Sequence, residues 1–137
     1  MNEMQAFNQK IIDEFRSNDG IVGGPFEGAP LLLLGTTGAK SGAARVNPLA
    51  YLEDGERLVI FASFAGADVH PPWYFNLRVN PEVTVEVGNE KFAARAETVE
   101  EPERSGLYKK MAGLMPAFAE YESKTDRVIP VISLTRS

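Results

Sequence analysis

The chain has 137 residues and a formal net charge of −5, and 44% of its residues are hydrophobic and 24% charged. These values are typical of a globular chain, so we expect a single domain over residues 1–137 that buries about two thirds of its unfolded surface. The acidic balance argues against nucleic acid as the main partner, because neutralising phosphates requires a concentrated basic surface. The sequence has no cysteine, which excludes disulfides and thiolate metal ligands and is typical of a reducing compartment.

The N-terminal region is predicted to form an amphipathic helix at about residues 2–19. Its apolar residues Met4, Phe7, Ile11 and Phe15 recur at spacings of three and four, which places them on one helix face. Such a face packs on the core or lies on a membrane surface, and the polar face, which is not basic, favours the core. The segment lacks the features of a signal peptide, and no apolar run approaches a transmembrane span. We therefore expect a cytoplasmic protein, and a peripheral contact with the inner face of the membrane stays open.

The rest of the chain predicts a mainly β (α+β) fold with six antiparallel strands. Apolar runs, alternation and turn signals place the strands at residues 29–36, 45–53, 57–63 and 127–134 and, as a hairpin around Gly88 and Asn89, across 81–99. Helices are expected within 70–81 and over 102–124, with a break or kink at Pro116. Because consecutive strands are joined too tightly for parallel crossovers, a small antiparallel β-barrel with peripheral helices fits best.

The stretch GTTGAKSGAAR, residues 35–45, has the composition of an anion-binding loop. Glycines let backbone N–H groups approach an anion, hydroxyls donate hydrogen bonds, and Lys40 and Arg45 supply positive charge. The stretch is not a P-loop, because Ala39 separates Gly38 from Lys40 and a strand follows instead of a helix. Composition leaves two interpretations open, a local anion site or a flexible hairpin loop with two solvated cations.

Three motifs of this chain, taken together, resemble those of a known family. They are G-x-K-S-G-x-x-R-x-x-P-L from residue 38, H-P-x-W-Y-x-N-L-x-x-N-P from residue 70 and R-x-I-P-V from residue 127. Over residues 31–136 the chain resembles the deazaflavin (coenzyme F420)-dependent nitroreductase family, split β-barrel oxidoreductases of actinobacteria. The resemblance implies a six-stranded antiparallel split β-barrel like that of FMN-binding and pyridoxamine-oxidase-like proteins. It also implies hydride transfer from reduced F420, an 8-hydroxy-5-deazaflavin, to a small organic acceptor such as a quinone, enone or nitro compound.

The resemblance also assigns residues to a site. F420 carries a phosphodiester-linked lactyl and oligoglutamate tail, which would explain an anion site on an acidic protein. The implied cofactor-binding residues are Lys40, Ser41, Gly42 and Arg45 at the tail, Pro48, Leu49 and Ala50 behind the ring system, and Phe61, Ala62, Ser63, Phe64, Trp73 and Asn76 around the pocket. The implied substrate pocket consists of Met115, Phe118 and Tyr121. Ser63 and Tyr121 are the candidate catalytic residues, because a hydroxyl beside the acceptor oxygen can stabilise developing charge or relay a proton.

Other interpretations of the same features stay open. A non-catalytic F420-binding or carrier protein and an FMN-dependent split-barrel oxidoreductase are the rival functions, with FMN the less favoured cofactor. Core packing is an alternative role for Trp73, Phe118 and Tyr121. The single histidine, His70, is interpreted as a helix cap or a partner of the backbone, and no metal site is expected. The protein is expected to act on a small molecule as a monomer or homodimer.

Overall fold

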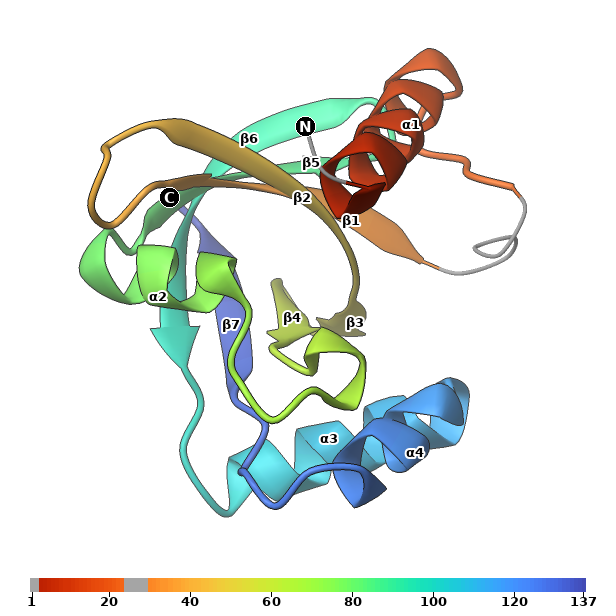
Figure 1. Ribbon diagram of the computed structural model, residues 1–137, viewed down its shortest axis with the longest axis vertical. Coiled ribbons are helices and arrows are strands. Elements are labelled where there is room, and N and C mark those ends of the chain that lie inside the picture. Colours follow the sequence, from red (N-terminus) through yellow and green to blue (C-terminus); the bar gives the residue numbers. More distant parts are fainter. Residues whose placement is uncertain (1–2, 24–29) are drawn as a thin grey trace.

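The computed structural model describes residues 3–23 and 30–137 and is built on one antiparallel sheet of seven strands (Figure 1). The strands are β1 (Leu31–Thr37), β2 (Ala44–Ala50), β3 (Leu52–Asp54), β4 (Arg57–Phe61), β5 (Glu82–Val87), β6 (Glu90–Thr98) and β7 (Val131–Arg136). Their order in the sheet is β2-β1-β5-β6-β7-β4-β3. β2 and β3 thus lie at opposite ends of the sheet although they follow one another in the chain, so the sheet must curl round on itself. The predicted mainly β, barrel-like fold is confirmed.

The predicted number of six strands is wrong, because the strand expected over 45–53 is divided at Tyr51. β2 pairs with β1, whereas β3 pairs with β4 on the other end of the sheet. At the division the Tyr51 N–H donates to the carbonyl of Pro30 at 3.2 Å. One run of β-forming residues therefore changes partners where the sheet curls. Local pattern alone does not reveal such a change of partner.

The other predicted strands are present with shifted ends. The first is β1, and residue 29, its expected start, lies outside the described residues. The strand expected over 57–63 ends at Phe61, and the last strand starts at Val131 instead of residue 127. The hairpin around Gly88 and Asn89 is confirmed as β5 and β6.

Four α-helices lie around the sheet in the described part of the chain, in the regions where the sequence predicts helices. They are α1 (Glu3–Ser17), α2 (Pro72–Val79), α3 (Glu103–Leu114) and α4 (Ala117–Ser123). The predicted break at Pro116 separates α3 from α4. In Figure 1, α1 lies on one side of β1 and β2, and α2 and the α3–α4 pair lie on the other. No helix among the described residues has the length and apolar character needed to cross a membrane.

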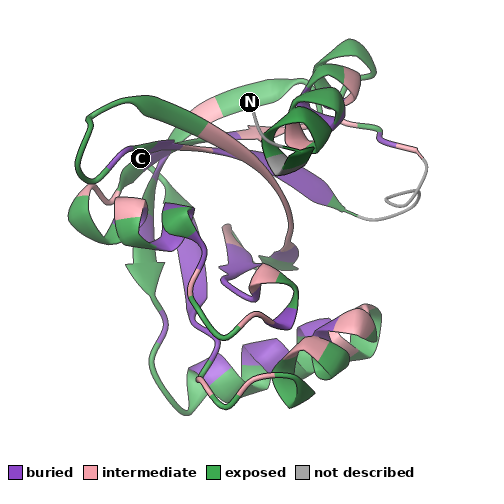
Figure 2. Ribbon diagram, in the orientation of Figure 1, coloured by how far each residue is buried: buried purple, intermediate pink, exposed green. Residues whose placement is uncertain are grey.

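The run of four leucines in β1 is buried on both faces of the strand. Leu31 and Leu33 pack with Ile11, Ile12 and Phe15 of α1. The alternate residues, Leu32 and Leu34, belong to a second cluster, which contains Trp73, Tyr74 and Leu77 of α2. A strand covered on both sides needs no polar alternation, which is why this one reads as a continuous apolar run. Figure 2 shows the burial concentrated on the sheet and on the helix faces that cover it.

Packing of α1 on the core is confirmed for two of the four residues of its predicted apolar face. Ile11 and Phe15 are 6% and 1% exposed. Phe7 is 45% exposed and so is not a core residue, and the side chain of Met4 lies outside the described residues. Arg16 adds an ion pair with Glu86 of β5 at 2.8 Å, which ties the end of the helix to the sheet.

Candidate functional site

The loop between β1 and β2 is a defined hairpin with two exposed cations. The Gly38 N–H donates to the Ala43 carbonyl at 2.8 Å, and the Gly42 N–H donates to the Gly38 carbonyl at 3.0 Å. Gly42 has a φ of +70°, a left-handed conformation that favours glycine. Lys40 and Arg45 are exposed, and within the described residues neither forms an ion pair. Their charges are therefore available to an external anion.

Asn76 of α2 holds this hairpin in place. Its Oδ1 accepts a hydrogen bond from the Ala39 N–H at 3.0 Å, and its Nδ2 donates to Thr36 Oγ1 at 3.3 Å. The predicted cofactor-binding residue thus lies beside the predicted anion loop, which it braces directly. Because both ends of its amide are already used, we assign Asn76 the role of fixing the loop between Thr36 and Ala43.

The predicted ring-binding residues of β2 are half-buried and span the interior clusters. Leu49 packs against the cluster that contains Ala62 and Trp73. Ala50 packs against a third cluster, which contains residues of β3, β4, β7, α3 and α4. Pro48, Leu49 and Ala50 are paired with Leu33, Leu32 and Leu31 of β1. This arrangement leaves a partly exposed apolar strand next to the hairpin, as a ring system would require.

β4 runs into a turn of unusual backbone conformation. Ser63 is helical in φ and ψ, whereas Phe64, Ala65 and Gly66 have φ values of +47°, +54° and +83°. A residue other than glycine in this region costs about 1–3 kcal/mol, so the surroundings must hold the turn in place. Ser63 is 8% exposed, and its hydroxyl makes no capping bond to the turn. We call residues 63–67 the β4 turn.

Arg127 contacts the β4 turn and was not predicted as a site residue. Its Nε donates to the Ala67 carbonyl at 2.8 Å, and one terminal nitrogen donates to the Ser63 carbonyl at 2.9 Å. The other lies 3.1 Å from His70 Nδ1. Because a guanidinium only donates, Nδ1 of His70 is the acceptor and the neutral ring carries its proton on Nε2. The only sequence signal for Arg127 was its place in the R-x-I-P-V motif.

The helix-cap interpretation of His70 is wrong. α2 begins after Pro71, and no side chain caps it. The His70 ring instead accepts from Arg127 and packs against Tyr74, with ring centroids 4.8 Å apart. A proline-rich helix start needs fewer capping bonds, because Pro72 has no N–H to satisfy.

The pKa of His70 lies below its ordinary value of 6.5, first because of burial and then because Arg127 and Arg78 repel the charged ring. As the pH falls through about 6.5, the unfolded chain binds this proton before the folded chain does, so the free energy of unfolding decreases. We expect His70→Asn to lose less stability than the unmodified protein between roughly pH 7.5 and pH 5.5. Urea unfolding of both proteins at the two pH values measures this, and an equal loss in the two would contradict it.

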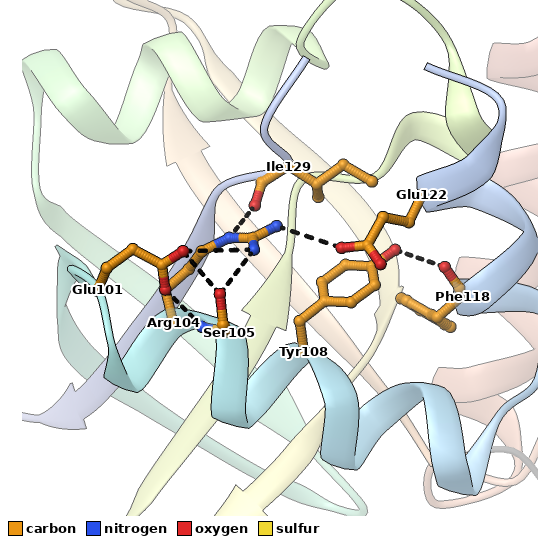
Figure 3. A network of polar contacts seen from close by, with 7 residues as sticks. All are labelled: Glu101, Arg104, Ser105, Tyr108, Phe118, Glu122 and Ile129. Atoms are coloured by element: carbon orange, nitrogen blue, oxygen red, sulfur yellow. Dashed lines mark hydrogen bonds and ion pairs between the residues drawn. The ribbon is translucent and has the colours of Figure 1, made fainter. Parts of the chain in front are cut away.

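The predicted acceptor pocket falls on the α3–α4 pair, which a buried arginine and tyrosine hold together (Figure 3). Arg104 donates from Nε to the Ile129 carbonyl at 3.0 Å, and its guanidinium lies 5.2 Å from the Tyr108 ring centroid. The Tyr108 hydroxyl donates to the Phe118 carbonyl at 2.6 Å. Burial, with a smaller effect from Glu122, raises the pKa of Tyr108 to about 12, so this hydroxyl remains a donor at neutral pH.

Phe118 belongs to the core, whereas its two predicted neighbours are half-buried. Its ring makes edge contacts with Phe61, Tyr108 and Tyr121 at centroid distances of 5.6, 6.3 and 5.3 Å. It is 6% exposed. Met115 and Tyr121 pack against the same cluster but keep part of their surface open. Of the two rings, Tyr121 and not Phe118 is therefore partly open to solvent.

Two surface pockets of the described residues are poorly suited to an anionic cofactor. A pocket of about 400 Å³ is lined by Arg57, Glu97, Thr98, Val99, Glu100, Glu101, Glu103 and Ser133, and one of about 200 Å³ by Glu53, Glu56, Leu58, Val87, Glu90, Phe92, Leu134 and Arg136. Neither contains a predicted site residue, and their carboxylates would repel a polyanionic tail. Among residues 3–23 and 30–137, no group of three His, Asp or Glu side chains is placed to hold a metal ion.

The protein is thus a curled antiparallel sheet with a cationic hairpin at one end of an apolar strand. Comparison with known proteins identifies the family: residues 8–136 match the F420H(2)-dependent quinone reductase family. The chain belongs to this family. The F420H(2)-dependent quinone reductase Rv1261c of Mycobacterium tuberculosis is 38% identical over 126 residues, which cover 89% of this chain and 85% of that protein.

Solved structures agree with this assignment. An F420-H2 dependent reductase (FDR-A) is 40% identical, covers 77% of this chain and 93% of its own, and has a TM-score of 0.70. A domain-swapped dimer is 33% identical, with coverages of 97% and 99% and a TM-score of 0.72. A pyridoxamine-5′-phosphate-oxidase-like protein from Listeria innocua, at 13% identity and a TM-score of 0.56, shares the fold alone. The split-barrel expectation is therefore confirmed.

Proposed function

We propose that this protein transfers hydride from reduced F420 to a quinone or a similar small organic acceptor. The observation that carries the proposal is the braced hairpin with two cations that form no ion pair within residues 3–23 and 30–137, in a chain that belongs to the F420H(2)-dependent quinone reductase family. An acidic protein that keeps such a loop beside a half-buried apolar strand is suited to a ligand with an apolar ring and an anionic tail.

The residues present fit F420 in charge and in polarity. Lys40 and Arg45 would hold the phosphodiester and glutamate groups, with Ser41 and Gly42 between them. Pro48, Leu49 and Ala50 would lie behind the ring system. Phe64 is half-buried at the β4 turn and would contact the ring directly, while Phe61, Ala62 and Trp73 are buried and support that wall from within.

The bound deazaflavin would supply the hydride, so the main task of the protein is positioning. The apolar strand and the aromatic cluster would exclude water from the ring and hold it near the acceptor. The hydroxyls of Ser63 and Tyr121 would donate to the acceptor oxygen as negative charge develops there. Of the three residues predicted for the acceptor pocket, Tyr121 alone carries a phenol, and we expect Met115 to contribute an apolar surface.

We further propose that the protein acts in the cytoplasm, where it reaches lipid-soluble acceptors at the inner face of the membrane. The similarity to a domain-swapped dimer favours a homodimer over a monomer. Sedimentation without vesicles tests the homodimer, which a monomer would contradict. Sedimentation with vesicles tests the membrane contact, which protein that stays in solution would contradict.

Mixing the protein with reduced F420 and menadione tests the proposed activity. We expect oxidation of the cofactor above the rate without protein, with an enone and a nitro compound as further acceptors. Tight F420 binding without turnover on any acceptor would instead identify a carrier protein. Flavin absorbance in the purified protein, with no affinity for F420, would identify an FMN enzyme.

A further inference from the structure

Arg127 joins three segments of the chain, of which the β4 turn carries the predicted site residues Ser63 and Phe64. Through Ser63 and Ala67 it holds the β4 turn, and through His70 it reaches the segment that leads into α2. It is itself part of the segment between α4 and β7. Its three nitrogens are all used, with distances of 2.8, 2.9 and 3.1 Å. A fork with this geometry fixes the relative position of its partners more firmly than a single contact would.

Arg127 occupies a half-buried position where a cation is not favoured. Burial lowers the pKa of Arg127, and Asp68 only partly opposes this. Within the described residues no carboxylate lies within 4 Å to form an ion pair with it. The backbone carbonyls of the turn take the place of that partner. Such an arrangement orders the backbone around the cation, since each carbonyl must remain aimed at it.

The β4 turn needs an external constraint because its backbone is strained. Phe64 and Ala65 both adopt left-handed φ values, which the chain alone would relax. The turn is also packed closely against α4, because a Cβ atom placed on Gly66 would lie 3.2 Å from the Cα atom of Tyr121. A shift of the turn would therefore move Ser63 and Tyr121 together.

We propose that Arg127 is a positioning residue of the F420-dependent reaction, which holds the β4 turn so that Ser63, Phe64 and Tyr121 keep their places around the ring and the acceptor. This inference rests on the proposed function. Arg127 itself need not touch the cofactor, because it acts through the backbone of the turn.

The test compares Arg127→Gln and Arg127→Lys with Arg95→Gln, a control that removes an exposed arginine paired with Glu82 on the β5–β6 hairpin. Three quantities are measured: deuterium uptake of the amides at residues 61–69, F420 affinity by fluorescence titration, and kcat and KM with menadione. We expect faster uptake in both Arg127 variants. We also expect an F420 Kd raised by about tenfold or more, equivalent to about 1.4 kcal/mol, and a lower kcat.

The lysine variant separates geometry from charge. It keeps the cation but cannot span two carbonyls and a ring nitrogen, so we expect its kcat to remain as low as that of Arg127→Gln. Full recovery of kcat in Arg127→Lys, or faster uptake with unchanged Kd and kcat, would overturn the inference and leave the proposed function intact. If the unmodified protein neither binds nor oxidises reduced F420, the proposed function fails and the inference fails with it.

Discussion

Replacing Lys40 or Arg45 by alanine is expected to weaken F420 binding by about 1–3 kcal/mol each, the range of charge-assisted hydrogen bonds. Both side chains are exposed, and neither has an ion-pair partner in the described part of the chain. Alanine therefore removes charge without breaking a contact that stabilises the fold. Fluorescence titration at low and high salt measures the change in affinity, which should be smaller at high salt because exposed charges are screened.

Exposed lysines on α3 provide the matched control for this experiment. Lys109→Ala and Lys110→Ala remove the same charge from a helix that carries none of the predicted tail-binding residues. We expect them to leave F420 affinity unchanged apart from a small general effect of net charge. Equal affinity in the Lys40 and Arg45 variants and in the unmodified protein would place the tail elsewhere.

The sequence allowed the elements of this fold to be predicted because their signals are local. The Val83–Val87 alternation with the turn at Gly88 defines a hairpin, and Pro116 breaks or kinks a helix. The change of partner at Tyr51 could not be predicted in this way. It depends on which strands lie at the two ends of the sheet, and that is a property of the whole topology.

The candidate site was predictable where a motif is continuous in the chain, as at residues 38–49. It was not predictable where the contacts connect distant segments. Asn76 and Ala39 are separated by 37 positions, and Arg127 and Ser63 by 64. The spacing of Phe118 and Tyr121 along a helix is equally compatible with a pocket and with a core. Only the packing of α4 on Phe61 makes Phe118 buried and leaves Tyr121 half-buried.

Phe118→Ala is expected to decrease the free energy of unfolding by about 3–5 kcal/mol, the cost of removing a buried aromatic side chain. The ring fills the space between Phe61, Tyr108 and Tyr121, and a well-packed core relaxes only partly around the cavity left behind. The hydrogen bond from Tyr108 to the backbone carbonyl of residue 118 can remain, so the loss would report on packing. Urea unfolding monitored by circular dichroism measures it.

Tyr121→Phe is the informative comparison, because it removes only a hydroxyl from the neighbouring half-buried ring. If Tyr121 acts on the acceptor while Phe118 supports the wall, this variant should change stability by less than about 1 kcal/mol and lower turnover with menadione. A small loss of stability in Phe118→Ala would show that the ring faces an open pocket. That outcome would return Phe118 to the acceptor site, where the family resemblance placed it. It would also show that α4 packs less firmly on β4 and α3 than the ring contacts of Phe118 indicate.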